Sequence, residues 1–248
     1  MSLVEALTEL DALARRLRRD CPWDREQTAK TIVPHTVEEA YEVADAALAD
    51  DDVKLLDELG DLLFQTFFLS LLLEEKGQGD LETVARGIQD KLVRRHPHVF
   101  GQEELASAAA VRTRWERIKR EQEGREGIFH DVPESLPALL YARKVQRRVA
   151  SVGFEYPDVD GALDDLADEL RELKEDYSAS ELGAVLFAAV NVSRRIDADP
   201  ELELRRATQR FRERVETAER LAGEAGESWT ELPLAEQDRY FDRAKEAE

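Results

Sequence analysis

Cysteine is almost absent from this chain of 248 residues, in which Cys21 is the single example. One cysteine excludes an internal disulfide framework and agrees with a reducing compartment, so we expect a cytoplasmic protein. Glycine and proline are also scarce, at 12 and 8 positions, whereas alanine, leucine, glutamate and arginine are abundant. A composition with so few helix-breaking residues predicts an all-α fold.

Long hydrophobic runs are missing as well. The run that follows Asp61 is one of the most apolar in the chain, but Gln65, Thr66 and Ser70 interrupt it. It therefore falls short of the roughly 20 apolar residues of a membrane span. Residues 2–20 carry acidic and basic side chains throughout, which predicts an amphipathic helix rather than a signal peptide. We expect no membrane partner.

Positive charge is in deficit, with 35 Lys and Arg against 55 Asp and Glu and a formal net charge of −20. Because nucleic-acid binding depends on cations that meet phosphates, this balance argues against a DNA or RNA polymer as the main partner. Basic residues still gather locally, and a basic patch beside an acidic cluster suits a small phosphorylated ligand. The basic groups lie at residues 15–19, 91–95 and 112–120, and we interpret the first as a solvated helix face.

Carboxylates are concentrated in residues 36–61, where they form two pairs, Glu39 with Glu42 and Glu58 with Asp61. Residues three apart on a helix share a face, so two antiparallel helices joined by a short loop would bring both pairs together. Four carboxylates in one place repel each other unless their pKa values rise or a cation binds. With no Cys or His among them, the predicted cation is Mg²⁺, followed by Mn²⁺.

Helix capping is the alternative role for Glu39. Thr36 followed by Glu39 matches a capping box, and for Glu39 alone this is the preferred interpretation. Glu58 and Asp61 instead border an apolar run, where carboxylates need partners. Gly60 lies between them, and glycine inside a helix costs about 1 kcal/mol relative to alanine. We therefore expect that another group approaches the backbone closely at Gly60.

Further helices are predicted along the first half of the chain. Residues 21–35, with two prolines and Trp23, are predicted to form an irregular loop that has room for a short helical turn. The KGQGD segment at residues 76–80 predicts a turn before a helix over residues 81–95. Another helix is predicted over residues 108–121.

The second half repeats this pattern in weaker form. DELREL at residues 168–173 echoes EEAYEV at residues 38–43, and ELGAVLFAAV from Glu181 echoes ELGDLLFQTF from Glu58. The second copy is degenerate, because alanine replaces Asp61 in it. Its positions that match the first cluster are Glu169, Glu172, Glu181 and Ala184.

The division into two related units follows from this repeat. A segment that contains glycines and prolines, residues 123–137, is predicted to link a unit of residues 1–122 to a unit of residues 138–248. A helix as apolar as residues 62–73 has more surface than three neighbouring helices cover, which predicts a homodimer.

Four motifs in order resemble one family: EExxE followed by ELGDLLFQ, then DKLVRRHPHVF and WERIK. They resemble the tandem-domain MazG nucleoside triphosphate pyrophosphohydrolases, and the resemblance covers nearly the whole chain, including CPWD near its start. It implies an all-α fold related to the dimeric dUTPases and a homodimer of four-helix-bundle units. It also implies Mg²⁺-dependent cleavage of a nucleoside triphosphate to a nucleoside monophosphate and pyrophosphate.

The resemblance also assigns residue roles. Glu39, Glu42, Glu58 and Asp61 match the metal-binding carboxylates, and Glu38 is the candidate helper of the attacking water. The substrate-binding positions are Lys91, Arg94, Arg95 and Trp115, the last being an aromatic position near the nucleotide. For the cations of this set, the alternative is a stabilising position at a helix C-terminus. In the second copy Arg210 replaces Lys91 and Phe241 replaces Trp115. Because Ala184 also removes a ligand and a charge, we predict that residues 138–248 are catalytically silent or nearly so.

The chemistry needs these residue types. Attack of water at the α-phosphorus builds negative charge, which carboxylate-held Mg²⁺ and nearby cations stabilise without a covalent intermediate. A carboxylate-bridged di-iron bundle normally adds Glu-x-x-His pairs, and the acidic helices have none. A non-catalytic helical interaction or regulatory module is the remaining alternative. The histidines are predicted to lie in loops and to have structural or incidental roles: His35, His96, His98 and His130.

Overall fold

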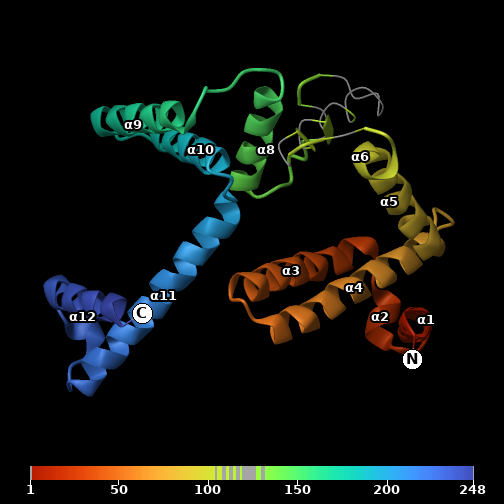
Figure 1. Ribbon diagram of the computed structural model, residues 1–248. Helices are drawn as coiled ribbons and strands as arrows, with labels where there is room; N and C mark the ends of the chain where they lie inside the picture. The colour runs from red at the N-terminus through yellow and green to blue at the C-terminus, as the bar shows by residue number, and fades with distance from the viewer. Residues whose placement is uncertain are drawn as a thin grey trace. The chain divides into compact units, whose positions relative to one another are not determined.

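The computed structural model describes residues 2–103, 105–107, 110–111, 114–115, 118, 127–129 and 132–247. The chain divides into two compact units, residues 1–118 and 119–248. Throughout the described ranges the regular structure is helical, which confirms the predicted all-α fold (Figure 1). None of the described helices is long and apolar enough to cross a membrane.

The first unit is built around a pair of long helices, α3 and α4, that lie side by side (Figure 1). Its described helices are α1 (Leu3–Asp20), α2 (Pro22–Glu26), α3 (Ala29–Leu48), α4 (Asp52–Glu74), α5 (Leu81–Arg95) and α6 (Pro97–Phe100). The turn between α3 and α4 is short because Asp50 adopts a left-handed conformation, with φ of 52°. Asp51 then caps α4 by accepting a hydrogen bond from the Lys54 N–H at 3.0 Å.

Helix α3 begins earlier than the sequence suggested. The predicted loop over residues 21–35 is wrong in its second part, because α3 already begins at Ala29. Thr28 caps the helix there, and it forms a capping box with Thr31 in the first turn. Pro34 lies inside the helix, where it has no N–H to donate. Thr36 is therefore an interior residue, and its hydroxyl donates to Gln65 Oε1 on α4 at 3.3 Å. The capping role considered for Glu39 is wrong.

The core of this pair lies beyond the carboxylates, toward the C-terminal end of α4. Ile32 on α3 is buried with Phe68 and Leu72 on α4, and Phe64 packs against this cluster. Burial of side chains of this size stabilises the pair by about 1.5–3 kcal/mol each. The core therefore fixes the register in which the polar residues of the two helices face each other.

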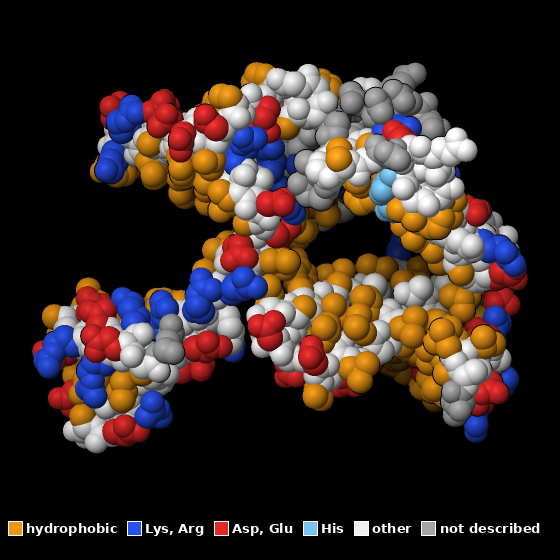
Figure 2. Space-filling model, viewed as in Figure 1, with side chains coloured by type: hydrophobic (Ala, Val, Ile, Leu, Met, Phe, Trp, Pro, Cys, Tyr) orange, Lys and Arg blue, Asp and Glu red, His pale blue; other side chains and the backbone are white. Residues whose placement is uncertain are grey.

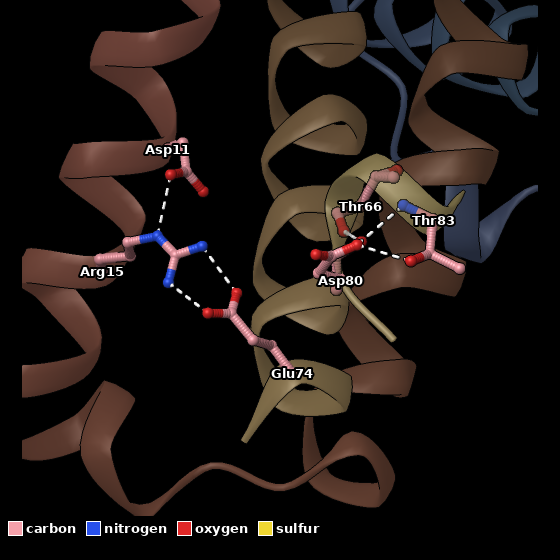
Figure 3. Close-up of polar contacts among 7 residues, drawn as sticks. Asp11, Arg15, Thr66, Glu74, Asp80 and Thr83 are labelled. Atoms are coloured by element: carbon pink, nitrogen blue, oxygen red, sulfur yellow. Dashed lines mark hydrogen bonds and ion pairs between the residues drawn. The ribbon is translucent and has the colours of Figure 1, made fainter. Parts of the chain in front are cut away.

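Helix α1 is held to α4 by two arginines from the basic group at residues 15–19, which was predicted to be a solvated helix face. Figure 3 shows Arg15 between Asp11 on its own helix and Glu74 on α4, with the shortest contact to Glu74 at 2.6 Å. Arg18 makes two hydrogen bonds to Glu75, at 2.7 and 2.8 Å. The interpretation is wrong for these two side chains, because bidentate carboxylate contacts fix their position.

Helix α5 has the bounds that the sequence predicted. Gly77 and Gly79 supply positive φ angles in the preceding turn, and the Asp80 carboxylate accepts the Thr83 N–H at 2.8 Å (Figure 3). Pro97 does more than end α5, because it starts the short helix α6. The helix predicted over residues 108–121 lies largely outside the described residues, although its described members are helical.

The second unit contains a comparable helix pair, α9 and α10, that also lies side by side (Figure 1). Gln146 on α8 fastens that helix to α10 by donating to the Phe187 carbonyl at 2.8 Å. The hydroxyl of Tyr240, buried between α11 and α12, donates to Glu227 at 2.8 Å. The described elements are α8 (Ala138–Ala150), α9 (Val159–Glu175), α10 (Ala179–Arg195), α11 (Pro200–Glu224), the 3₁₀ turn η1 (Trp229–Glu231) and α12 (Leu234–Glu246).

Candidate metal centre

Three of the predicted carboxylates meet between α3 and α4. Glu39 comes from α3, and Glu58 and Asp61 come from α4, one turn apart on the same face. One carboxylate oxygen from each lies within 4.8 Å of the others. The antiparallel arrangement predicted from the sequence thus brings residues about 20 positions apart into one cluster.

Glu42, the fourth predicted carboxylate, is not one of the three that meet within 4.8 Å, but it lies close enough to act on both Glu39 and Glu58. Its side chain is exposed, whereas Glu58 is the most buried member of the set, with 8% of its surface accessible. The cation next to Glu58 is Lys54, one turn earlier on α4, with Nζ 3.8 Å from the carboxylate. Lys54 is not among the predicted site residues, although its i,i+4 spacing from Glu58 is visible in the sequence.

The carboxylates of the cluster repel one another, and burial together with this repulsion raises the pKa values of two of them. Burial raises the pKa of Glu39, and the charges of Asp61, Glu42, Glu58 and Glu38 raise it further. The pKa of Glu58 is also raised, first by burial and then by the charge of Glu42 and a hydrogen bond shared with it, while Lys54 opposes the shift. One nearby ammonium group does not balance these carboxylates, so the site favours a bound cation.

The donor set suits a hard divalent cation. All of the donors are carboxylate oxygens on facing helices, and such oxygens are the ligands that Mg²⁺ and Mn²⁺ take in proteins. The neighbouring turn of the helix pair is closed by the hydrogen bond between Thr36 and Gln65. Gln65 is buried, so this contact holds α3 and α4 at a fixed spacing beside the carboxylates.

Glu38 and Gly60 differ from what the sequence suggested. Glu38 lies on the exposed side of α3, where its carboxylate is 3.1 Å from His35 Nδ1. His35 is itself in α3 and not in the predicted loop, because the helix starts at Ala29. At Gly60 an added Cβ would meet nothing within 4 Å in the described chain. The close approach expected there is therefore wrong for the isolated chain.

The predicted substrate-binding residues come from the end of α5 and from the chain after α6. Lys91, Arg94 and Arg95 occupy the end of α5, which packs against α4 beyond the turn at residues 76–80. Trp115 stands edge-on to His96, with ring centroids 5.1 Å apart, and its indole nitrogen is buried. The roles of these groups in substrate binding stay predictions.

The second cluster also has three carboxylates. Glu169 and Glu172 of α9 and Glu181 of α10 each place an oxygen within 4.8 Å of the others. Burial raises the pKa of Glu169, and so do the charges of Glu172, Asp165 and Glu181. Ala184, half-buried one turn after Glu181, occupies the place that Asp61 has in the first cluster and offers no oxygen ligand.

Comparison with known proteins agrees with these features. Residues 27–100 match the model of the MazG nucleotide pyrophosphohydrolase domain. A nucleoside triphosphate pyrophosphohydrolase of Escherichia coli is 36% identical over 262 aligned positions, which cover all of this chain and 99% of the relative. A nucleoside triphosphate pyrophosphohydrolase/pyrophosphatase MazG of Thermotoga maritima is 37% identical over 245 positions, 96% of this chain and 94% of the relative.

A solved structure is also similar. The crystal structure of a mazG-related protein from Thermotoga maritima aligns with a TM-score of 0.41 at 25% identity, covering 46% of this chain and 99% of that one. The full-length similarity to the two relatives and the match over α3, α4 and α5 show the family directly. The chain belongs to the MazG nucleotide pyrophosphohydrolase family.

Proposed function

We propose that this protein hydrolyses nucleoside triphosphates to nucleoside monophosphates and pyrophosphate, and that Mg²⁺ held between α3 and α4 supports the reaction. The observation that carries the proposal is the meeting of Glu39, Glu58 and Asp61 within 4.8 Å. The names of full-length relatives support the same activity. Mn²⁺ has the same ligand preference and is the alternative ion.

Glu39, Glu58 and Asp61 would hold the ion, with Glu42 beside them. When bound, a divalent ion neutralises phosphate charge and lowers the pKa of a coordinated water. The protein supplies the rest: the helix pair fixes the carboxylates, and the hydrogen bond from Thr36 to Gln65 keeps the helices in register. Glu38 is exposed next to the cluster and is our candidate to accept a proton from the attacking water.

The cations at the end of α5 are proposed to bind the phosphates. Lys91 and Arg95 are four residues apart and share a face, so a single polyphosphate chain can contact both. A charge-assisted hydrogen bond of this kind contributes about 1.5–3 kcal/mol. We keep Trp115 as a proposed aromatic contact of the nucleotide.

We propose a homodimer formed through the outer face of α4. Leu56, Leu59 and Leu63 lie within one face of this helix, opposite Glu58 and Asp61, and all three side chains are exposed. Figure 2 shows hydrophobic side chains gathered over α3 and α4. A second copy packed on this face would complete a four-helix bundle and bury the apolar patch. Changing both Leu56 and Leu63 to Asp should convert the dimer to a monomer in light scattering.

We further propose that the substrates are free nucleotides and that the protein acts in the cytoplasm. The net charge of −20 supports free nucleotides over DNA or RNA polymers as substrates. The single cysteine supports a reducing compartment, the cytoplasm. We also propose that the second unit contributes little to turnover, because Ala184 removes a ligand and a charge together.

The direct test is an assay of pyrophosphate release from a panel of nucleoside triphosphates with and without Mg²⁺. We expect release that depends on the metal and that yields the nucleoside monophosphate as the other product. Release of inorganic phosphate and a nucleoside diphosphate would contradict the assigned bond. No hydrolysis of any triphosphate would favour the non-catalytic helical module.

A further inference from the structure

Trp23 is an aromatic side chain whose position a core role does not explain. It lies on α2, and 52% of its surface is exposed. Its ring meets the ring of His35 on α3 edge to face, with centroids 5.8 Å apart and an angle of 65° between the planes. One side of the indole is therefore fixed on the protein, and the rest faces solvent.

The short helix that carries Trp23 is braced. Arg18 Nη1 donates to the backbone carbonyls of Asp24, Arg25 and Gln27, at 2.6, 2.9 and 3.0 Å. The amide of Gln27 in turn donates to the carbonyl of Trp23 at 3.0 Å. Such bracing lowers the conformational entropy that the indole would lose when a ligand covers it. The indole is presented as a preorganised surface.

Its location is next to the carboxylate cluster. His35 is four residues before Glu39, so it lies one helical turn away on the same side of α3. One turn rises by about 5.4 Å, which is within the length of a nucleotide whose phosphates are held at the carboxylates. His35 Nδ1 is also 3.1 Å from a Glu38 oxygen, which fixes the ring against which Trp23 packs.

The second unit has a matching feature. Asp165 is four residues before Glu169, and it accepts a hydrogen bond from the hydroxyl of Tyr156 at 2.9 Å. The ring of Tyr156 lies over Gly161, where an added Cβ would come within 3.1 Å of it. Each unit thus places an aromatic residue against the side chain one turn before its first clustered glutamate. The aromatic position therefore recurs beside the carboxylate cluster in both units.

We propose that Trp23 is the surface on which the base of the nucleoside triphosphate stacks while its phosphates are held at the carboxylate cluster. The inference rests on the proposed function and adds the base-binding residue to it. Every nucleobase has a π-face, so stacking on an indole accepts several bases. This role is separate from the one proposed for Trp115, whose ring packs on His96 and whose indole nitrogen is buried.

The test compares a ligand that has a base with one that lacks it. In the full-length protein, Trp23→Ala should raise the KM for nucleoside triphosphates roughly tenfold, because loss of one base stack weakens binding. Trp23→Phe should restore most of the affinity. Inhibition by Mg²⁺-tripolyphosphate, which has no base, should be the same in all variants. The matched control is Tyr177→Ala, because Tyr177 is another exposed aromatic, at 87%, and should change nothing.

Three results would overturn the inference. One is an unchanged KM in Trp23→Ala protein, and another is an equal loss of tripolyphosphate inhibition, which would show that the substitution disturbs the carboxylates. The third is a Trp23→Phe variant no better than Trp23→Ala. A wild-type protein that hydrolyses no triphosphate would instead overturn the proposed function itself, so the two failures are distinguishable.

Discussion

The two helix pairs, α3 with α4 and α9 with α10, hold similar carboxylate clusters that differ at the position of Asp61 and Ala184. Both place three carboxylate oxygens within 4.8 Å of one another. In the first pair Glu58 is almost fully buried, whereas none of the three glutamates of the second pair is buried. In the second pair Ala184 stands where a ligand would be. The two pairs thus each bring three carboxylates together, and the second lacks an oxygen ligand at the position that matches Asp61.

The two pairs also differ in the number of carboxyl groups whose pKa is raised. The first raises the pKa of two carboxyls, Glu39 and Glu58, mainly through burial and then through neighbouring charge. In the second pair the raised pKa belongs to Glu169. The more strongly the carboxylates of a cluster repel one another, the more a bound cation stabilises them. The comparison therefore predicts that the first pair binds metal more tightly.

The largest expected effect comes from giving the first cluster the composition of the second. Asp61→Ala should lower kcat/KM for pyrophosphate release by more than about 100-fold, because even partners outside the ligand set cost 10–100-fold when removed. Steady-state kinetics at saturating Mg²⁺ measures this. Wild-type turnover in Asp61→Ala protein would show that the working site is elsewhere.

The reverse change, Ala184→Asp, serves as its control. It adds a carboxylate to the second cluster and should raise the Mn²⁺ affinity of that site without restoring activity to the Asp61→Ala protein. Calorimetric titration with Mn²⁺ follows the affinity. Full recovery of turnover would mean that a single ligand is all that the second unit lacks.

A smaller effect is expected from the cations that follow each helix pair. Lys91→Ala should raise the KM roughly tenfold with little change in kcat, because a phosphate contact is lost without disturbing the metal. Arg210→Ala, at the matching position on α11, should leave both constants unchanged. If Lys91 only stabilises its helix end, its removal would lower the melting temperature slightly and leave KM unaltered.

The pH dependence of stability gives a third way to compare the clusters. Because the folded pKa values of Glu39 and Glu58 lie above the unfolded value, the folded state holds extra protons between the two values. Stability without metal should therefore fall as pH rises through this window, and Mg²⁺ should stabilise more at about pH 7.5 than at about pH 5. Thermal melts with and without Mg²⁺ test this, and Glu39→Gln should reduce the difference more than Glu169→Gln.

The smallest effect concerns the glycines beside the clusters. Gly60→Ala and Gly183→Ala should each stabilise the protein by about 1 kcal/mol, because both are helical and an added Cβ meets open space. Chemical denaturation measures the free energies of unfolding. Loss of stability at Gly60 alone would show that a second copy approaches α4 closely at that point.

Local signals predicted a large part of this fold from the sequence. Helix α5 runs from Leu81 to Arg95 as expected, because Asp80 caps it and two flexible glycines precede it. The start of α3 was missed because Pro34 suggested a break, whereas the Thr28 cap is strong enough to begin the helix before it. Tertiary support for a proline inside a helix cannot be seen in a local pattern.

In the candidate site, too, some features could be predicted from the sequence and others could not. Spacing of three along each helix identified Glu39, Glu58 and Asp61, and the repeat identified Glu169 and Glu181 as their counterparts. The burial of the Glu58 carboxylate and the exposure of the Trp23 ring depend on how separate helices pack, so they required the structure. The placement of Lys91 relative to the cluster remains a prediction from resemblance.

One measurement tests the central claim that the first cluster performs the reaction and the second does not. Pyrophosphate release from mixed nucleoside triphosphates, at saturating Mg²⁺, should be abolished by Glu39→Ala with Glu42→Ala in the full-length protein. The matched pair, Glu169→Ala with Glu172→Ala, should leave release largely intact. Full activity in the first double variant together with loss in the second would contradict the account and assign the reaction to α9 and α10.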